Sequence, residues 1–210
     1  MKLIGMLDSP YVRRVAISLQ LLGLRFEHQS LSVFRTFAEF EKINPVVKAP
    51  TFIADDDTVL MDSTLILQYA DALARPRTLM PSGPGALCAA LHILGLALAA
   101  TEKSVQIVYE RSRPLEKQHE PWASRVAGQT IAAYSELESA LAGMSLPEAG
   151  STMDQPGITT AVAWHFTQQT IPDVVPAARF PRLAAFSRKA ESLREFRAAP
   201  HGDSTFHYER

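Results

Sequence analysis

The chain has 210 residues, of which 47% are hydrophobic and 20% are charged, and its formal net charge is -1. A chain of this length can bury a substantial core, and its composition excludes a disordered protein. The near-neutral charge, with no basic run longer than Arg13-Arg14, argues against nucleic acid or an acidic membrane surface as a partner. The single cysteine, Cys88, excludes an internal disulfide framework and favours a reducing, cytoplasmic location.

The first half of the chain predicts alternating strands and helices. Residues 2–7 form a candidate strand, and Ser9-Pro10 then supplies a serine cap followed by a proline suited to the first helical turn. Apolar residues recur at helical spacing up to Gly23, a typical helix C-terminus. Residues 26–31 are a second candidate strand, and the β-α-β order predicts that it is parallel to the first.

The pattern continues with a short helix over residues 36–43 and a hairpin. Residues 51–54 and 59–61 flank Asp55-Asp56-Asp57, whose residue type is common in turns, so the two runs predict antiparallel strands. A helix over residues 63–73 follows. We therefore predict an α/β domain over residues 1–75, and the proline- and glycine-rich residues 76–84 predict a linker.

Beyond the linker the periodicity is helical, and we predict an all-α domain over residues 85–210 that ends in a polar tail over residues 201–210. Two apolar stripes show the helical spacing: Val126, Thr130, Ala133, Leu137 and Leu141, then Leu183, Phe186, Ala190 and Leu193. Residues 86–100 are apolar except for His92, but they are fewer than the roughly 18 residues that span a bilayer. We expect a buried or interface helix there, with Cys88 as a core or interface residue.

Lys48-Ala49-Pro50 precedes the first strand of the hairpin. Proline cannot donate a ladder hydrogen bond, so Pro50 belongs at the first residue or the edge of a strand. A cis bond before Pro50 would turn the N–H and C=O of Ala49 outward, where they can pair with an extended peptide ligand. The alternative is a trans bond, with Pro50 serving only as the first residue of the strand.

Two hydroxyl residues stand at predicted helix starts. At Asp62-Ser63, the Ser63 hydroxyl and the first free N–H groups would form an anion site, and Asp62 could accept from a ligand ammonium. Ser9 lies at the carboxyl edge of the sheet, where its hydroxyl could donate to a ligand thiolate and lower the pKa of that thiol. An ordinary helix cap is the alternative interpretation for both.

These motifs, with Asn44-Pro45 between them, make the chain resemble a cytosolic glutathione S-transferase over essentially its whole length. The resemblance implies a thioredoxin-like N-terminal domain followed by an all-helical domain. It also implies that the Ala49–Pro50 bond is cis and that the Ala49 backbone binds the cysteinyl part of glutathione. Asp62 and Ser63 would hold the γ-glutamyl end, and Lys48 would meet the glycine carboxylate.

Ser9-Pro10-Tyr11-Val12 occupies the position of the Cys-Pro-Tyr-Cys motif of glutaredoxins. Because both cysteines are absent, dithiol exchange is excluded at this site. Ser9 would activate the thiol of glutathione and would not itself attack a substrate. Tyr11 is the alternative source of the activating hydroxyl.

The resemblance places the pocket for the second substrate in the helical domain, where Tyr109 and Arg113 are candidate lining residues. A solvated or interdomain salt-bridge role is the alternative for the arginine. Many members of the family carry a Ser/Thr-x-x-Asp cap on a core helix of this domain; here Thr159 keeps the cap residue and Val162 replaces the acid.

The leading functional hypothesis is a glutathione transferase that presents the thiolate to a small hydrophobic electrophile or a peroxide. Glutathione would be a co-substrate, no metal is expected because the histidines lack ligand spacing, and the resemblance suggests a homodimer with the apolar helix near its interface. The rival is a noncatalytic binding or regulatory protein with the transferase fold. The intact Ala49-Pro50 and Asp62-Ser63 elements favour at least glutathione binding, which a pure scaffold need not retain.

Overall fold

The computed structural model describes residues 1–143, 146–148 and 153–208. It divides into two compact units, one formed by Met1–Leu79 together with Ser192–Arg210 and the other by Met80–Glu191. The sequence predicts one helical domain over residues 85–210. The structure instead groups the residues from Ser192 onward with the N-terminal unit.

The N-terminal unit is built on a four-stranded sheet with the strand order β2-β1-β3-β4. The strands are β1 (Lys2–Ile4), β2 (Glu27–Gln29), β3 (Thr51–Ile53) and β4 (Val59–Met61). β1 pairs parallel with β2 and antiparallel with β3, and β3 pairs antiparallel with β4. The thioredoxin-like fold predicted for this half, including the hairpin, is confirmed.

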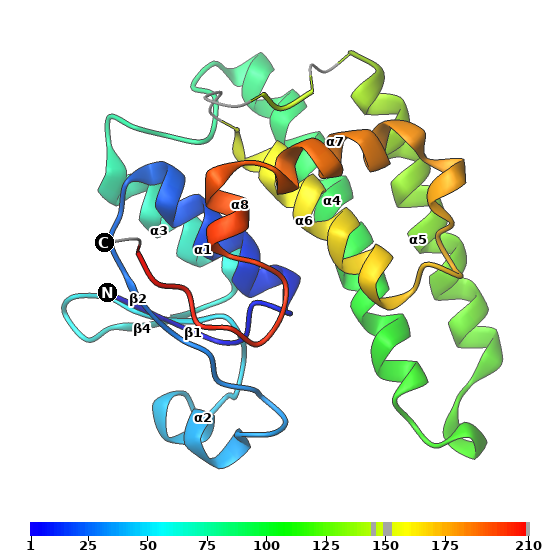
Figure 1. The fold of residues 1–210 in the computed structure, drawn as a ribbon, viewed down its shortest axis with the longest axis horizontal. Helices are drawn as coiled ribbons and strands as arrows, with labels where there is room; N and C mark the ends of the chain where they lie inside the picture. The colour runs from blue at the N-terminus through cyan, green and yellow to red at the C-terminus, as the bar shows by residue number, and fades with distance from the viewer. Residues whose placement is uncertain (144–145, 149–152, 209–210) are drawn as a thin grey trace. The chain divides into compact units, whose positions relative to one another are not determined.

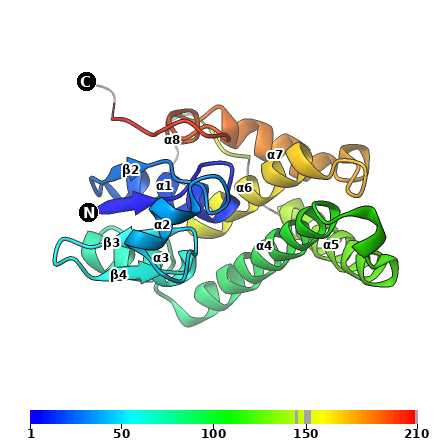
Figure 2. The ribbon, with the colours of Figure 1, turned by 90° about the horizontal axis from the view of Figure 1, so that it is seen from below.

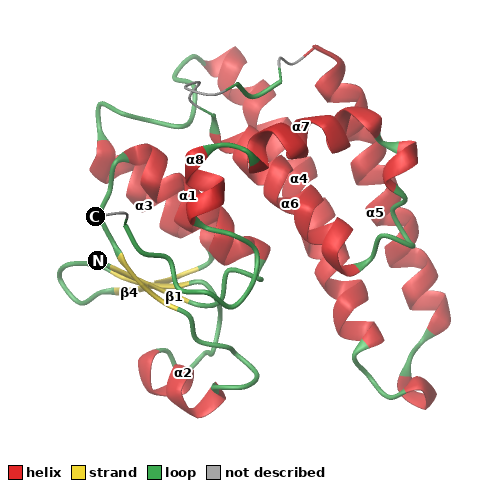
Figure 3. Cartoon of the chain, viewed as in Figure 1, coloured by secondary structure: helices red, strands yellow, loops and turns green. Residues whose placement is uncertain are grey.

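Helices cover both faces of this sheet (Figures 1 and 3). α1 (Pro10–Leu22) and α3 (Ser63–Ala74) pack together on one face, and α2 (Phe37–Ile43) lies on the other. α1 begins after Ser9, as predicted, and ends at Gly23, whose φ of 74° lies in the left-handed region that glycine adopts without steric cost. The carboxyl end of β1 therefore leads directly to the N-terminus of α1.

The chain returns to the N-terminal unit through α8 (Arg194–Ala198), which packs against α1. The buried guanidinium of Arg13 donates from Nε to the carbonyl oxygen of Ala199 at 2.8 Å. The sequence predicts a polar tail over residues 201–210, and residues 203–205, 207 and 208 are indeed exposed. Phe206 differs, since it is only 5% exposed and its ring stacks on Phe26. Residues 209–210 lie outside the described part. We call residues 200–208 the C-terminal strap.

The second unit is helical, as predicted, and its main helices are α4 (Pro84–Arg111), α5 (Glu120–Ala140), α6 (Gln155–Thr170) and α7 (Pro181–Glu191) (Figure 2). Short 3₁₀ turns lie between them: η1 (Leu115–Lys117), η2 (Leu141–Gly143) and η3 (Ala177–Arg179). The predicted stripe residues are buried, which confirms the periodicity: Val126, Thr130, Ala133, Leu137, Leu141, Leu183, Phe186 and Ala190.

α6 begins earlier than the expected Thr159 cap. Asp154 is the cap, and its carboxylate accepts the N–H of Gly157 at 2.9 Å. Thr159 lies inside the helix, where its hydroxyl donates to the carbonyl oxygen of Gln155 at 2.8 Å. Val162 is 2% exposed, so the apolar residue at the position of the family's acid fills the core of the unit.

α4 has one side in the bundle, against α5 and α6, and exposes apolar residues elsewhere. In the part of the chain that the structure describes, it is the helix that is long and apolar enough to cross a membrane, with a mean hydropathy of 1.7 in its most apolar stretch. Only 22% of that stretch is buried, Leu91 is 50% exposed, and Cys88 is exposed. A core position for Cys88 is therefore wrong, and the interface alternative stays open.

Candidate functional site

Ser9 lies where the loop after β1 enters α1. Its backbone is extended, with φ -71° and ψ 121°, and its Oγ accepts the N–H of Val12 at 3.5 Å. A serine hydroxyl that accepts this bond keeps its O–H proton for another partner. The hydroxyl thus stands at the positive end of the α1 dipole and can still donate to a bound anion.

The loop before β3 is organised by Asn44, which is 2% exposed. Its Nδ2 donates to Thr51 Oγ1 at 2.8 Å, and its Oδ1 accepts the N–H of Val46 at 3.0 Å. The Thr51 hydroxyl donates to the carbonyl oxygen of Lys48 at 2.8 Å. These bonds hold the segment that contains the Ala49–Pro50 peptide, which is cis, as the resemblance implied.

Gly5 brings the Ser9 loop and the Ala49–Pro50 segment together. Its φ of 135° is unfavourable for residues with a side chain, and an added Cβ would come within 2.7 Å of Val12 Cγ2 and 3.2 Å of Ala49 Cβ. Glycine therefore allows the loop after β1, the first turn of α1 and Ala49 to approach one another closely. Two segments whose motifs are 40 residues apart in the sequence therefore both pack closely around Gly5.

Asp62 and Ser63 form the third part of this site. Asp62 caps α3, with a φ of 69° and a carboxylate that accepts the N–H of Thr64 at 2.9 Å. Ser63 opens the helix and is 3% exposed. The cap that we considered as the alternative is therefore present, and it leaves the positive N-terminus of α3 beside these two residues.

Arg14 is the residue that sequence reasoning missed. Its guanidinium is 2% exposed, and its Nη1 donates to Ser63 Oγ at 3.1 Å and to Thr64 Oγ1 at 3.3 Å. Among the described residues its Nε has no hydrogen-bond partner. Burial lowers the pKa of Arg14 to about 10, against the opposing effects of Asp62 and Tyr11. Arg14 is still charged at neutral pH, and it adds positive charge behind the N-terminus of α3.

The sequence carried one signal for this arginine. Two successive arginines, Arg13 and Arg14, are the charged residues of an otherwise uncharged helix, and a charged residue is buried only where polar partners compensate its desolvation. The structure separates their roles, since Arg13 donates to the chain beyond α8 and Arg14 donates to the start of α3.

Lys48 links the Ala49–Pro50 segment to the start of α3. Its Nζ lies 3.9 Å from Asp62 Oδ2, and both side chains are about half exposed. A pair this exposed adds only about 0–1 kcal/mol to stability. Its significance is geometric, because an ammonium and a carboxylate stand together at the surface of the site, where a ligand with both charges can meet them.

The remaining predicted site residues divide between the two units. Tyr11 lies in the first turn of α1, close enough to affect the pKa of Arg14. Tyr109, at the end of α4, is 53% exposed in the second unit. Arg113, just beyond α4, pairs with Glu110 at 3.1 Å, a local pair within the second unit. A pocket role for Tyr109 and Arg113 stays a prediction.

The chemistry of the site is that of an anion-binding cradle within one unit. Two helix N-termini, the buried guanidinium of Arg14 and the ammonium of Lys48 favour negative charge, while Asp62 offers a carboxylate to a cation. In the described ranges, no three His, Cys, Asp or Glu side chains gather in a group that could hold a metal ion. The arrangement suits a zwitterionic ligand with an extended backbone.

Comparison with known proteins identifies the type of domain. Residues 3–78 match the family model described as glutathione S-transferase, N-terminal domain. The uncharacterized GST-like protein YibF of Escherichia coli (strain K12) is 27% identical over 120 residues. That match spans 57% of this chain and 59% of YibF, so it covers little more than half of either protein.

Solved structures extend the likeness to the whole chain. A glutathione S-transferase from Methylobacterium radiotolerans, in complex with glutathione sulfonate, has a TM-score of 0.85 at 24% identity, over 100% of this chain and 98% of that one. A glutathione transferase family member from Pseudomonas fluorescens Pf-5, with bound glutathione, has a TM-score of 0.81 at 28% identity, over 94% and 97%. Together the comparisons support the glutathione S-transferase superfamily, whose fold this chain has.

Proposed function

We propose that this protein is a glutathione transferase that binds glutathione in the N-terminal unit and activates its thiol. One observation carries the proposal. The close approach at Gly5 links the loop after β1 to the cis Ala49–Pro50 segment, and the Arg14–Ser63 hydrogen bond links α1 to the start of α3, so we take the Ser9, Ala49–Pro50 and Asp62-Ser63 motifs as parts of one site. Bound glutathione in the similar Pseudomonas fluorescens structure supports the choice of ligand.

Each end of the tripeptide has a chemically matched partner in this proposal. The γ-glutamyl carboxylate accepts from the Ser63 hydroxyl and the first N–H groups of α3, and its ammonium donates to Asp62. The cysteinyl backbone pairs with the N–H and C=O of Ala49, as in strand addition. The glycine carboxylate meets Lys48. These contacts place the cysteinyl sulfur near Ser9.

Ser9 then acts on the thiol. Its hydroxyl donates to the sulfur, and the α1 N-terminus adds positive potential, so the thiolate is favoured and its pKa falls below the ordinary value of roughly 8.5. The thiolate attacks a small hydrophobic electrophile, either displacing a leaving group as an anion or adding to the electrophile, which then takes a proton from water. Alternatively it reduces a peroxide to an alcohol and water, and a second glutathione thiol completes the oxidation to glutathione disulfide. Positioning and electrostatic stabilisation of the thiolate supply the catalysis. Tyr109 and Arg113 are the proposed contributions of the helical unit to the electrophile pocket.

We also infer a cytoplasmic homodimer. The exposed apolar residues of α4, including Leu91, would be covered by a second copy of the chain. The single cysteine suits a reducing compartment.

Titration calorimetry with reduced glutathione tests the proposal. We expect binding with a dissociation constant in the micromolar to millimolar range. An absence of binding at millimolar glutathione would contradict the proposal and favour a noncatalytic protein with the transferase fold. If glutathione binds, turnover of a panel of electrophiles and peroxides then identifies the second substrate.

A further inference from the structure

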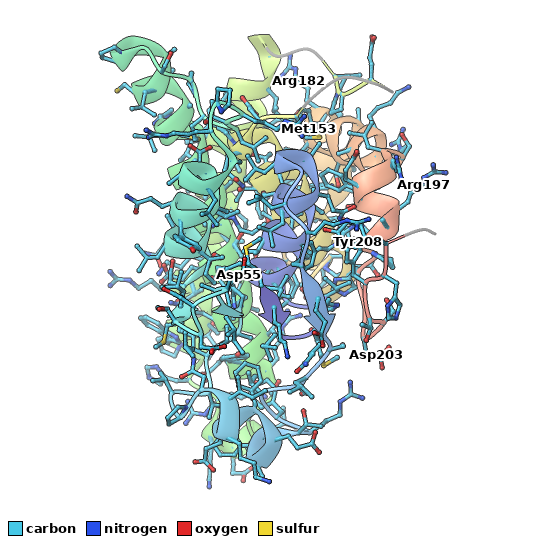
Figure 4. All side chains as sticks on the ribbon, turned by 90° about the vertical axis from the view of Figure 1, so that its left-hand side faces the viewer. Asp55, Met153, Arg182, Arg197, Asp203 and Tyr208 are labelled. Atoms are coloured by element: carbon cyan, nitrogen blue, oxygen red, sulfur yellow. The ribbon has the colours of Figure 1, made fainter. Side chains whose placement is uncertain are left out.

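The C-terminal strap runs along β2, the edge strand of the sheet. Near one end, the carbonyl oxygen of Asp203 accepts from the Ser30 hydroxyl at 2.8 Å. Near the other, the Tyr208 hydroxyl donates to the carbonyl oxygen of Leu24 at 2.9 Å. The strap and β2 therefore run in opposite directions. Figure 4 shows Asp203 and Tyr208 near the two ends of this contact.

Ring packing and an ion pair hold the strap in this position. The ring of Phe206 stacks on Phe26, with centroids 4.9 Å apart and an interplanar angle of 11°, and Tyr208 packs edge-on against both rings. Arg35 pairs with Asp203 at 3.6 Å at the surface. The apolar contacts are the main attraction, because an exposed ion pair contributes little.

His28 lies beneath the strap on β2 and is 4% exposed. Its Nδ1 accepts the backbone N–H of Phe206 at 2.9 Å, and its Nε2 lies 2.7 Å from the carbonyl oxygen of Gly5. Since Nδ1 is an acceptor here, the ring proton is on Nε2 and donates to Gly5. Both nitrogens are satisfied only by this one neutral tautomer.

We propose that His28 is a positioning residue that couples docking of the C-terminal strap to the loop carrying Ser9, and that the strap docks only while the His28 ring is neutral. The consequence for Ser9 rests on the proposed function; the docking itself does not. The His28 ring thus connects the loop after β1 to the strap, whose Phe206 is 178 residues away from His28 in the sequence.

Gly5 makes this coupling effective. Its backbone packs closely against both Val12 and Ala49, since a Cβ on Gly5 would come within 2.7 Å of Val12 Cγ2 and 3.2 Å of Ala49 Cβ, so a displacement of Gly5 would disturb its contacts with the first turn of α1 and with the Ala49–Pro50 segment. The His28 hydrogen bond holds the Gly5 carbonyl, and the Gly5 N–H donates to the carbonyl oxygen of Gln29 at 3.0 Å. Loss of the strap would leave His28 hydrated and free to leave Gly5.

Protonation opposes docking. It would add a hydrogen to Nδ1, which would then face the N–H of Phe206. Burial lowers the pKa of His28 below its ordinary value of 6.5, the Gly5 carbonyl opposes this, and His207 on the strap adds to the decrease. The other charged groups on the packed elements are Asp8, Arg25, Glu27, Arg35, His201 and Asp203; Glu27 is paired with Lys2 and Asp203 with Arg35.

The lowered pKa of His28 in the docked state determines how docking depends on pH. The undocked state, with His28 in water, binds a proton more readily than the docked state. Docking is therefore fully favourable above the ordinary pKa of 6.5 and weakens as the pH falls from 6.5 toward the lower pKa of buried His28. Acidification should release the strap first, before the rest of the N-terminal unit unfolds.

Hydrogen exchange of the Phe206 amide, followed by NMR without glutathione, tests docking directly. In the wild type, the protection factor should fall between about pH 7.5 and pH 5.5, because the undocked state takes up a proton on His28 more readily than the docked state does. His28→Asn keeps an acceptor at the Nδ1 position and cannot be protonated, so its protection should not depend on pH. His28→Gln keeps a donor toward Gly5 but not the acceptor, so its protection should be low at both pH values.

A substitution at a residue other than His28 tests the coupling between the strap and the Ser9 loop. Phe206→Ala removes the stacked ring and loosens the strap without changing His28. The NMR-titrated pKa of His28 should rise toward its ordinary value, and the amide signals of Gly5 and Ser9 should shift. Unchanged Gly5 and Ser9 signals, or an equal pH dependence in His28→Asn and wild type, would overturn the proposal.

Glutathione measurements then separate the two proposals. If the wild type binds glutathione, Phe206→Ala should raise the pKa of the bound thiol, read from thiolate absorbance; an unchanged pKa would refute the effect on Ser9. If the wild type does not bind glutathione, the proposed function fails, while the exchange experiments still decide whether His28 controls the strap.

Discussion

Arg14 on α1 donates from Nη1 to the hydroxyl of Ser63, the first residue of α3, across 3.1 Å. The arginine occupies a lone pair of the Ser63 oxygen, so the Ser63 O–H proton is available to an incoming carboxylate. The buried positive charge and the α3 dipole act in the same direction on that carboxylate. This relationship makes Arg14 a positioning residue for the proposed glutathione site.

Replacing Arg14 should weaken glutathione binding. Arg14→Met keeps much of the buried volume but removes the charge and the hydrogen bond to Ser63. A hydrogen bond involving a charged group contributes about 1.5–3 kcal/mol, so we expect an affinity about 10- to 100-fold lower by calorimetry.

The neighbouring Arg13 offers a matched control. Arg13 is equally buried, but it donates to the carbonyl oxygens of Ala199 and Phe196 near α8. Arg13→Met should lower the denaturation midpoint of the N-terminal unit and leave the glutathione affinity of the folded protein unchanged. Equal losses of affinity in both variants would mean that Arg14 has no specific role at the ligand site.

Removing the Ser9 hydroxyl should raise the pKa of the bound thiol. Ser9→Ala keeps the α1 dipole but deletes the donor to sulfur, and we expect an increase of about 1 unit, equivalent to about 1.4 kcal/mol, in a titration of thiolate absorbance. Tyr11→Phe is the control and should leave this pKa unchanged. The opposite pattern in the two variants would assign the hydroxyl role to Tyr11.

The loop that presents Ala49 should depend on Asn44. Asn44→Ala removes the hydrogen bonds to Thr51 and Val46 and leaves buried polar groups without partners. The free energy of unfolding measured in urea should fall by about 1–3 kcal/mol. Gln68→Ala, on the exposed side of α3, should change it by less than about 0.5 kcal/mol. A neutral Asn44→Ala would show that the loop is held by other contacts.

The apolar side of α4 should mediate self-association. Leu91→Lys places a charge on a side chain that is 50% exposed, and we expect the dimer dissociation constant in sedimentation equilibrium to rise by at least about tenfold. Leu115→Lys, at a position that is 84% exposed in η1, tests whether any exposed leucine has the same effect. A wild type that is monomeric at all concentrations would contradict the dimer.

Local signals in the sequence determined the main elements of the fold. Ser9 and Gly23 were recognised as helix ends, the aspartates after β3 as a turn, and Pro50 as the start of a strand, because each depends on backbone preferences of a few adjacent residues. The cap of α6 was misplaced, since Asp154 and Thr159 are both acceptable cap residues and only packing distinguishes them. Helical periodicity likewise identified the buried stripes of α5 and α7.

The sequence by itself thus determined which residues begin strands and helices, and it identified Ser9, Ala49, Asp62 and Ser63 as candidates from their positions at those ends. Only the tertiary structure decided what supports them. Arg14 meets Ser63 across 49 residues, and His28 meets Phe206 across 178. Such contacts leave no local pattern, because a buried polar side chain is stabilised by whichever partners the folded chain brings to it. Burial of Phe206 likewise fixes a largely exposed polar tail on the edge of the sheet.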